Sequence, residues 1–196
     1  LAHLRNEIQA VPGDTYARFL AKWQGVESEG GGLDRLIEVV GQLEGLPVPA
    51  SVLERDILRA RVQGYQPRLL DELCAAGEVV WVGRGGLQRD DGRIALYRRE
   101  RLAVLRPLPV DPPAGELADA IRRHLEERGA SFYREIYEAA GGGPEARVLD
   151  ALWELAWAGE VTNDTFAPLR ALRHRRVSQS HRGPPRLPRV GPPEAA

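Results

Sequence analysis

The sequence has no Met, a single Lys and a single Cys among its 196 residues. One Cys excludes an internal disulfide, and neither Cys74 nor any of the four His residues has metal-ligand spacing, so we expect a reduced, cytoplasmic protein without bound metal. No apolar run approaches the roughly 18 residues of a membrane helix, so no membrane partner is expected. Because the chain starts at Leu1 and lacks Met, we expect it to be part of a longer protein.

The scarcity of Lys excludes one class of nucleotide site. A phosphate-binding loop of the Walker type needs a Lys between Gly and Ser or Thr, whereas Lys22 is followed by Trp23. Gly83, Gly85 and Gly86 follow a predicted strand, but no helix begins after them to face a phosphate, so they indicate a hairpin turn. We therefore expect no cofactor site within this chain.

The other 26 basic residues are all Arg, whose planar guanidinium suits phosphate. Seven of them, with one Glu, lie from residue 170 onward, which leaves residues 1–169 with a net charge of −7. Residues 174–196 combine Arg, Pro, Ser and Gly with little to bury. This composition predicts a basic, disordered linker or tail.

An internal repeat indicates two related modules. Residues 70–79 read LDELCAAGEV and residues 149–161 read LDALWELAWAGEV. Each copy predicts a helix that ends at a Gly, Gly77 or Gly159, before the pattern becomes extended. After Gly77, the alternating stretches EVVWVG and RIALYRR around the turn signal Asp91-Gly92 predict a β-hairpin.

The order of the predicted elements is that of a winged helix. Upstream of the first copy, PASVLERDILRARV is helical, and a helix capped by Asp14 precedes it. In the second module we expect three helices, the middle one capped by Ser131, then a strand at Glu160-Val161, a turn at Asn163 and Asp164, and a new helix capped by Asp164 or Thr165. The fold class is thus mainly α with small antiparallel β-hairpins (α+β), as tandem winged-helix modules. The expected divisions are 1–45 (helical end of a preceding module), 46–110 and 111–173 (winged-helix-like modules) and 174–196 (tail).

Arg residues are the candidate nucleic-acid contacts, because a winged helix often rests its hairpin on a phosphate backbone. The alternative is that each is an ordinary surface Arg. The would-be recognition helix carries Asp71 and Glu72 with only Arg68 to offset them, which argues against base reading in a major groove. The candidates are Arg84, Arg89 and Arg93 on the hairpin, Arg134 and Arg147 in the second module, and Arg170, Arg173, Arg175 and Arg176 beyond it.

The remaining reactive or aromatic residues are better explained by packing. Cys74 lies on the apolar stripe of its helix, which favours core packing over reactivity. Trp153 and Trp157 are four positions apart on one helix face, and Trp81 lies in a predicted strand. All three could stack on bases, but core packing is the favoured interpretation. No catalytic residue is assigned.

Several stretches in colinear order resemble the C-terminal region of the large-helicase-related (Lhr) family of bacterial ATP-dependent superfamily 2 helicases. The resemblance implies winged-helix modules, a helicase core that binds ATP and Mg²⁺ outside this chain, 3′-to-5′ unwinding notably of RNA:DNA hybrids, and a role in DNA repair. In some members this region is linked to oligomerisation and uracil removal. The stretches are YARFLAKWQGV (16–26), GLDRLIEVVGQLEGLPVPASVLE (32–54), RVQGYQPRLLDELCAAGEVVWVG (61–83), DDGRIALY (90–97) and LWELAWAGEVTNDTFAPLRALR (152–173).

Three functions follow as hypotheses. The favoured one is an accessory segment of a repair helicase that binds DNA or an RNA:DNA hybrid mainly through phosphate contacts and packs with the helicase core of the same chain. The second is part of a DNA glycosylase-like unit that flips a base out of the duplex. The third is a scaffold for protein interaction or homo-oligomerisation.

Overall fold

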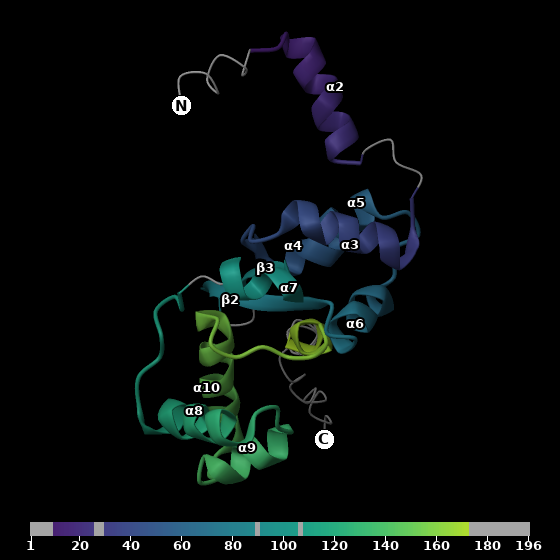
Figure 1. Ribbon diagram of the computed structural model, residues 1–196. Coiled ribbons are helices and arrows are strands. Elements are labelled where there is room, and N and C mark those ends of the chain that lie inside the picture. Colours follow the sequence, from purple (N-terminus) through teal and green to yellow (C-terminus); the bar gives the residue numbers. More distant parts are fainter. Residues whose placement is uncertain (1–9, 26–29, 89–90, 106–107, 173–196) are drawn as a thin grey trace, which may run out of the picture.

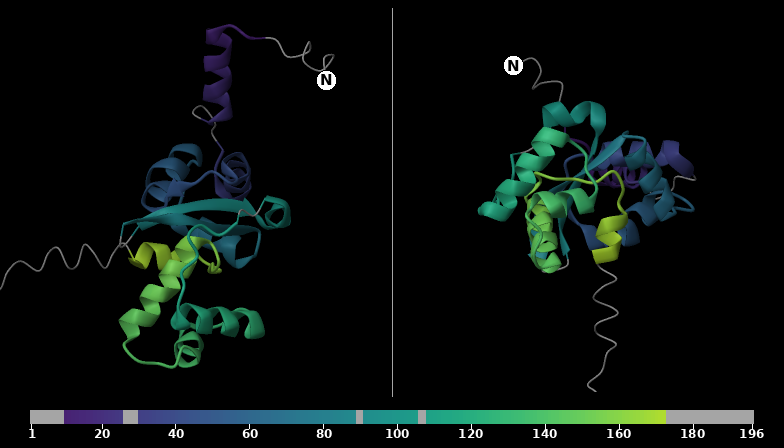
Figure 2. Two further views of the ribbon diagram at one scale, coloured as in Figure 1. Left: turned by 90° about the vertical axis from the view of Figure 1, so that its left-hand side faces the viewer. Right: turned by 90° about the horizontal axis from the view of Figure 1, so that it is seen from below.

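The computed structural model describes residues 10–25, 30–88, 91–105 and 108–172. A three-stranded antiparallel sheet lies at its centre with helices on both sides (Figures 1 and 2). The elements as far as the sheet's last strand are α2 (Gly13–Trp23), α3 (Gly32–Leu43), β1 (Val48–Pro49), α4 (Ala50–Val52), η1 (Leu53–Leu58), α5 (Arg59–Arg61), α6 (Pro67–Ala75), β2 (Val79–Gln88) and β3 (Asp91–Arg98). They are followed by α7 (Arg99–Leu105), α8 (Glu116–Arg128), α9 (Tyr133–Ala139) and α10 (Glu145–Ala158), and residues 167–172 are also helical.

The helices of the repeat begin and end where their residues predict. Pro67 occupies the start of α6, where its missing N–H leaves no donor unsatisfied. Gly77 follows α6 with a φ of 75°, and the next amide, of Glu78, bonds back to the carbonyl of Leu73 at 3.0 Å. Gly159 ends α10 in the same left-handed conformation, with a φ of 83°. The helix endings of both copies are therefore confirmed.

The predicted hairpin is formed by β2 and β3, and β1 pairs with the other edge of β3. The register sets Trp81 opposite Leu96 and Gly83 opposite Ile94. Because side chains alternate between the faces of a strand, Trp81 and Ile94 join the main core, whereas Tyr97 belongs to a smaller cluster. The fold class, mainly helical with a small antiparallel sheet, is confirmed.

One hydrophobic core runs through both predicted modules. Leu36 and Val40 of α3, Leu70 of α6, and Phe166 and Leu169 beyond α10 all belong to it, and each is at most 2% exposed. The packing unit therefore begins before residue 46 and extends past residue 111, so the two divisions that we predicted there cut through a single core. The physical reason is that the apolar stripe of α3 packs against β3 and α6, and that Phe166 and Leu169 are buried in the same core.

Helix α2 lies apart from this core, beyond α3 (Figure 1). None of its residues is buried, and Phe19 stacks on Trp23 with ring centroids 5.9 Å apart. The helix begins at Gly13 after Pro12, without a side-chain cap, so Asp14 is not the cap that we predicted. Asp14 instead accepts a hydrogen bond from Arg18 at 2.7 Å.

Helices α8, α9 and α10 form the predicted three-helix part of the second module. Ile121, Ile136 and Leu155 of the three helices pack in a small core of their own. Phe132, rather than the predicted Ser131, is the N-cap of α9, because the Ser131 hydroxyl donates to a carbonyl two residues earlier. Among residues 108–172 no strand is present, so the strand predicted at residues 160–161 does not form.

Glu160, where the strand was predicted, forms an ion pair with Arg122. Arg122 of α8 donates from Nε and Nη2 to both carboxylate oxygens of Glu160, at 2.5 and 2.8 Å. The same guanidinium also donates to Asp119 at 2.7 Å and to the Pro113 carbonyl at 2.6 Å. Arg122 thereby fixes both the segment before α8, at Pro113, and the segment after α10, at Glu160.

Candidate nucleic-acid interface

A β-bulge in the hairpin places Arg84 beside Arg93. The register between β2 and β3 shifts between Gly83 and Gly86, so that Arg84 and Gly85 together lie opposite Arg93. Gly85 has a φ of 99°, which residues with a side chain rarely adopt and which accommodates the extra residue. The sequence predicted both Arg residues as hairpin contacts, and the bulge explains how they become neighbours.

Arg84 is half-buried at the base of this pair. Its Nη1 donates to the carbonyl of Leu108 at 3.2 Å. Burial raises the pKa of Tyr97, and the positive charge of Arg84 opposes that rise, which places the guanidinium close to the phenol. Among the described residues Arg84 has no carboxylate partner, so its charge is not neutralised by an ion pair there.

Arg93 is exposed on β3, between β1 and β2. It forms no ion pair within the described part of the chain. Because side chains alternate along a strand, Arg93 lies on the same face of the sheet as Ala95 and Tyr97. Val82 of β2 belongs to this face, and so does Arg84, two positions after it. The hairpin thus presents two neighbouring cationic groups, an arrangement that suits successive phosphates.

Arg134 and Arg147 are not part of this pair. Both are exposed, on α9 and at the start of α10, and Figures 1 and 2 place these segments at the end of α10 away from the sheet. Arg134 donates to Glu138 at 3.0 Å, one helical turn along. Arg147 has no ion-pair partner among the described residues. Arg134 and Arg147 therefore lie apart from the hairpin pair.

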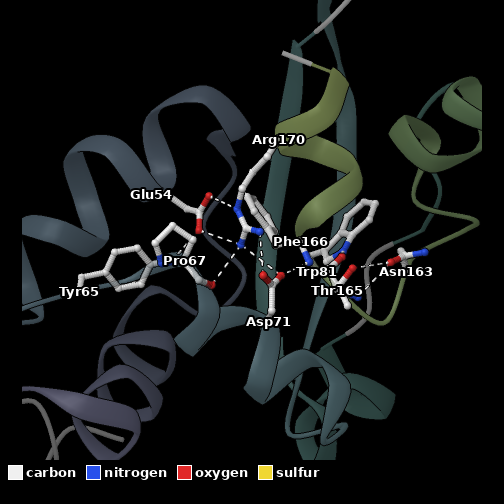
Figure 3. A network of polar contacts seen from close by, with 9 residues as sticks. All are labelled: Glu54, Tyr65, Pro67, Asp71, Trp81, Asn163, Thr165, Phe166 and Arg170. Carbon is white, nitrogen blue, oxygen red and sulfur yellow. Dashed lines mark hydrogen bonds and ion pairs between the residues drawn. The ribbon is translucent and has the colours of Figure 1, made fainter. Parts of the chain in front are cut away.

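Arg170 lies in a cluster of its own, with Glu54, Tyr65 and Asp71 (Figure 3). Its Nε donates to Glu54 at 2.8 Å, its Nη1 to Asp71 at 2.7 Å, and its Nη2 to the Pro67 carbonyl at 3.1 Å. Burial alone would lower the pKa of Arg170, but the two carboxylates raise it above its ordinary value. All three guanidinium nitrogens are engaged, so we assign Arg170 a structural role in place of the predicted phosphate contact.

The rest of this Arg170 cluster was not foreseen. Glu54 is 8% exposed and accepts the hydroxyl proton of Tyr65 at 2.6 Å. It lies in the π-helical turn η1, within an otherwise ordinary helical run. Its partner Arg170 is 116 positions away in the chain, so no local spacing could have indicated the pair.

Asp71 also caps the helix at residues 167–172. Its Oδ1 accepts the amide of Phe166 at 2.8 Å, and the amide of Ala167 bonds to the same carboxylate. Burial would raise the pKa of Asp71, but Arg170 and these two amides hold it below its ordinary value. The helix at 167–172 is thus capped by a residue of α6. The caps that the sequence suggested, Asp164 or Thr165, are not used. Asn163 does form the predicted turn, accepting both the amide and the hydroxyl of Thr165 at 3.0 Å.

The predicted core residues are confirmed as core. Trp81 is 2% exposed, Trp157 is buried, and Trp153 stacks against Trp157 with ring centroids 5.3 Å apart. Burial raises the pKa of the Cys74 thiol to about 12, so it is a packing residue.

Within the described residues no group of three or more His, Cys, Asp or Glu could hold a metal ion, and no helix has the length and apolar character to cross a membrane. Arg89, Arg173, Arg175 and Arg176 lie outside the described residues and stay predictions.

Comparison with known proteins agrees with this architecture. A family model for the winged-helix domain of large helicase-related protein matches residues 11–99, which span α2 to the end of the hairpin. The chain is 43% identical over 199 residues, 97% of its length, to a Mycolicibacterium smegmatis protein named Lhr helicase/probable uracil glycosylase. The chain belongs to the Lhr family. It is also 37% identical over 190 residues, 86% of its length, to the Escherichia coli Lhr helicase/uracil glycosylase.

The Lhr relatives are much longer than this chain. It spans 13% of the Mycolicibacterium smegmatis protein and 12% of the Escherichia coli protein. The matched domain begins at residue 11, well before the division predicted at residue 46. The family match therefore assigns α2 and α3 to the same winged-helix domain as the hairpin, and the shared core joins α3 to that hairpin.

Proposed function

We propose that this chain is an accessory nucleic-acid-binding segment of an Lhr-type helicase and that its hairpin contacts the phosphate backbone. The observation that carries the proposal is the pair of Arg84 and Arg93 at the bulge of the hairpin, within the matched winged-helix domain. Neither has a carboxylate partner in the described residues, so both can neutralise phosphates without first breaking an ion pair. Arg134 and Arg147 form a second, separate group of proposed contacts on the far module.

The binding expected from this arrangement is largely independent of base sequence. Phosphate contacts fix position and contribute affinity, whereas sequence is read at base edges. The two Arg residues lie on paired strands of the sheet rather than on a helix suited to a major groove. We expect the substrate to be DNA or an RNA:DNA hybrid, bound alongside a helicase core that hydrolyses ATP with Mg²⁺, in the cytoplasm and in the service of DNA repair. Lys22, the only Lys, precedes Trp23, so the ATP site belongs outside this chain.

Salt-dependent binding tests the proposal. The 196-residue chain is titrated into labelled single-stranded DNA, duplex DNA and RNA:DNA hybrid from about 50 to 200 mM salt, and fluorescence anisotropy gives the association constant. We expect binding that weakens steeply as salt rises, because each phosphate contact releases counterions. Absence of binding to all three nucleic acids at the lowest salt concentration would rule out the proposal.

A glycosylase-like role is the second candidate, favoured by the names of both relatives, which include uracil glycosylase. In this chain the carboxylates Glu54 and Asp71 are both ion-paired with Arg170, so neither is free to act as a catalytic group. Incubation with uracil-containing DNA followed by strand cleavage at abasic sites tests this role directly. Abasic product formed by the chain alone would favour base removal over accessory binding.

A further inference from the structure

The first turns of α6 are the part of this domain that a helix-turn-helix protein would place against base edges. In such proteins the N-terminal residues of the recognition helix enter the major groove. The corresponding residues here include Pro67, Arg68 and Asp71. Leu70, Leu73 and Cys74 face the core, so Arg68 and Glu72 point away from it, with Asp71 on the flank between.

That flank is already occupied by the chain's own segment 162–172. Arg170 bonds to the carbonyl of Pro67 and to the carboxylate of Asp71, and Asp71 accepts the amide of Phe166 (Figure 3). Phe166 is 1% exposed and Leu169 is 2% exposed, both in the main core that includes residues of α6. The contact is therefore a packed interface with a charged centre, rather than a surface ion pair.

Further bonds hold the start of the segment against the sheet. The hydroxyl of Thr162 donates to the Trp81 carbonyl at 2.6 Å, and the Trp81 indole N–H donates to the Thr165 carbonyl at 3.1 Å. Segment 162–172 is thus fixed to β2 at one end and to α6 and η1 at the other.

The width of the DNA major groove determines whether α6 can enter it with segment 162–172 packed alongside. The major groove of B-form DNA is about 12 Å wide, and one α-helix with its side chains is about 10–12 Å across. A second helical segment packed on the flank of α6 makes this surface too broad to enter the groove. We propose that segment 162–172 acts as a built-in partner of α6 that closes this helix to duplex DNA, with Arg170 as its positioning residue, so that nucleic acid meets the hairpin instead.

Hydrogen exchange of the Phe166 and Ala167 amides, followed by NMR on the 196-residue chain, tests the closed contact. Arg170→Ala removes the hydrogen bonds that hold Asp71 in place, and a hydrogen bond to a charged group stabilises the closed contact by a factor of about ten or more. We therefore expect the exchange of both amides to be at least about tenfold faster in this variant. Arg170→Lys, which keeps the charge and loses the planar fork, should give an intermediate increase and serves as the variant that stays folded. The matched control is Arg134→Ala, which removes an exposed i, i+4 ion pair and should leave both amides unchanged. Fast exchange in the unaltered chain, or unchanged exchange in both Arg170 variants, would overturn the proposal.

A second measurement, which rests on the proposed function, tests the consequence for nucleic acid. Arg68→Gln removes the only cation on the outward face of α6, and we expect duplex affinity to stay within about twofold of the unaltered chain. A loss of about tenfold or more would show that α6 does contact the nucleic acid and would overturn the closure. If the unaltered chain binds no nucleic acid, the proposed function fails, whereas the exchange result still decides whether segment 162–172 is latched onto α6.

Discussion

Arg170 and Asp71 lie 99 positions apart in the chain, and the guanidinium of one donates to both carboxylate oxygens of the other, at 2.7 and 3.1 Å. Asp71 belongs to the first copy of the internal repeat, and Arg170 follows the second copy. This pair therefore joins the two modules that the repeat predicts. Asp71, an acidic residue that argues against base reading in a major groove, thus anchors the helix at residues 167–172.

Removal of Arg170 should destabilise the protein substantially. Arg170→Ala leaves Glu54 and Asp71 as neighbouring part-buried carboxylates without a counter-charge, a change that typically costs 3–5 kcal/mol when the pair is fully buried. Because the Arg170 side chain is 20% exposed, we expect a smaller loss, about 2–4 kcal/mol in the free energy of unfolding. Urea denaturation followed by circular dichroism measures it.

A double-mutant cycle shows whether that loss belongs to the pair. Asp71→Ala combined with Arg170→Ala should cost less than the sum of the single substitutions, with a coupling of about 0.5–3 kcal/mol. Arg134→Ala, which breaks an exposed pair with Glu138, should change stability by no more than about 1 kcal/mol. Additive losses at Asp71 and Arg170 would contradict the arrangement described here.

Protonation of two carboxylates, Asp71 and Glu160, should destabilise the fold at acid pH. Burial would raise the pKa of Asp71, but Arg170 and two amides lower it; Arg122 lowers the pKa of Glu160 against a smaller effect of burial. A carboxyl whose pKa is lower in the folded state stabilises the fold above its unfolded pKa, and this stability is lost as pH falls through the folded pKa. The unfolded pKa is 3.8 for Asp71 and 4.5 for Glu160. We therefore expect the free energy of unfolding to decrease as pH falls below about 5.

The variants Asp71→Asn and Glu160→Gln test this assignment, since each removes one titrating group. Each should be less stable than the unaltered chain at neutral pH and should show a shallower decrease towards acid. Stability curves measured by urea denaturation across this pH range give the comparison. A pH dependence identical to that of the unaltered chain in both variants would assign the acid sensitivity elsewhere.

Close contact between the hairpin and α10 makes Gly83 intolerant of a side chain. A Cβ on Gly83 would lie 1.9 Å from the carbonyl oxygen of Ala156, so Gly83→Ala must push α10 away from β2. We expect a loss of about 3 kcal/mol in the free energy of unfolding, as for overpacking of a core. Gly13→Ala is the matched control, because nothing lies within 4 Å of its added Cβ, and it should change stability by less than about 1 kcal/mol. Equal effects of the two substitutions would contradict the packing of α10 on β2.

Local signals in the sequence were sufficient for most elements of the fold. Pro67 and Gly77 set the limits of α6, and the alternating pattern around Asp91 predicted the hairpin. These features depend on backbone preferences of a few neighbouring residues. The same reasoning correctly assigned Trp81 and Cys74 to the core, because their apolar spacing fits one buried face.

Long-range partners explain what the sequence did not predict. The repeat suggested a strand at Glu160, by analogy with Glu78, but Arg122 binds the Glu160 carboxylate, and the chain turns towards α6. Nothing within a few residues of Arg170 indicates that its guanidinium will meet Glu54. The sequence prediction therefore named Arg170 and Arg93 alike as phosphate contacts, although the first is enclosed by carboxylates and the second is exposed.

The hairpin contact is the central claim, and the salt dependence of binding by the variant Arg84→Gln/Arg93→Gln tests it most directly. Each lost phosphate contact should reduce the steepness of the plot of log association constant against log salt by about 1, so we expect a reduction of about 2 together with weaker binding at every salt concentration. Arg18→Gln, which removes one positive charge on α2 away from the hairpin, is the control and should leave both quantities unchanged. A double variant that keeps the affinity and the salt dependence of the unaltered chain would contradict a phosphate contact through the hairpin.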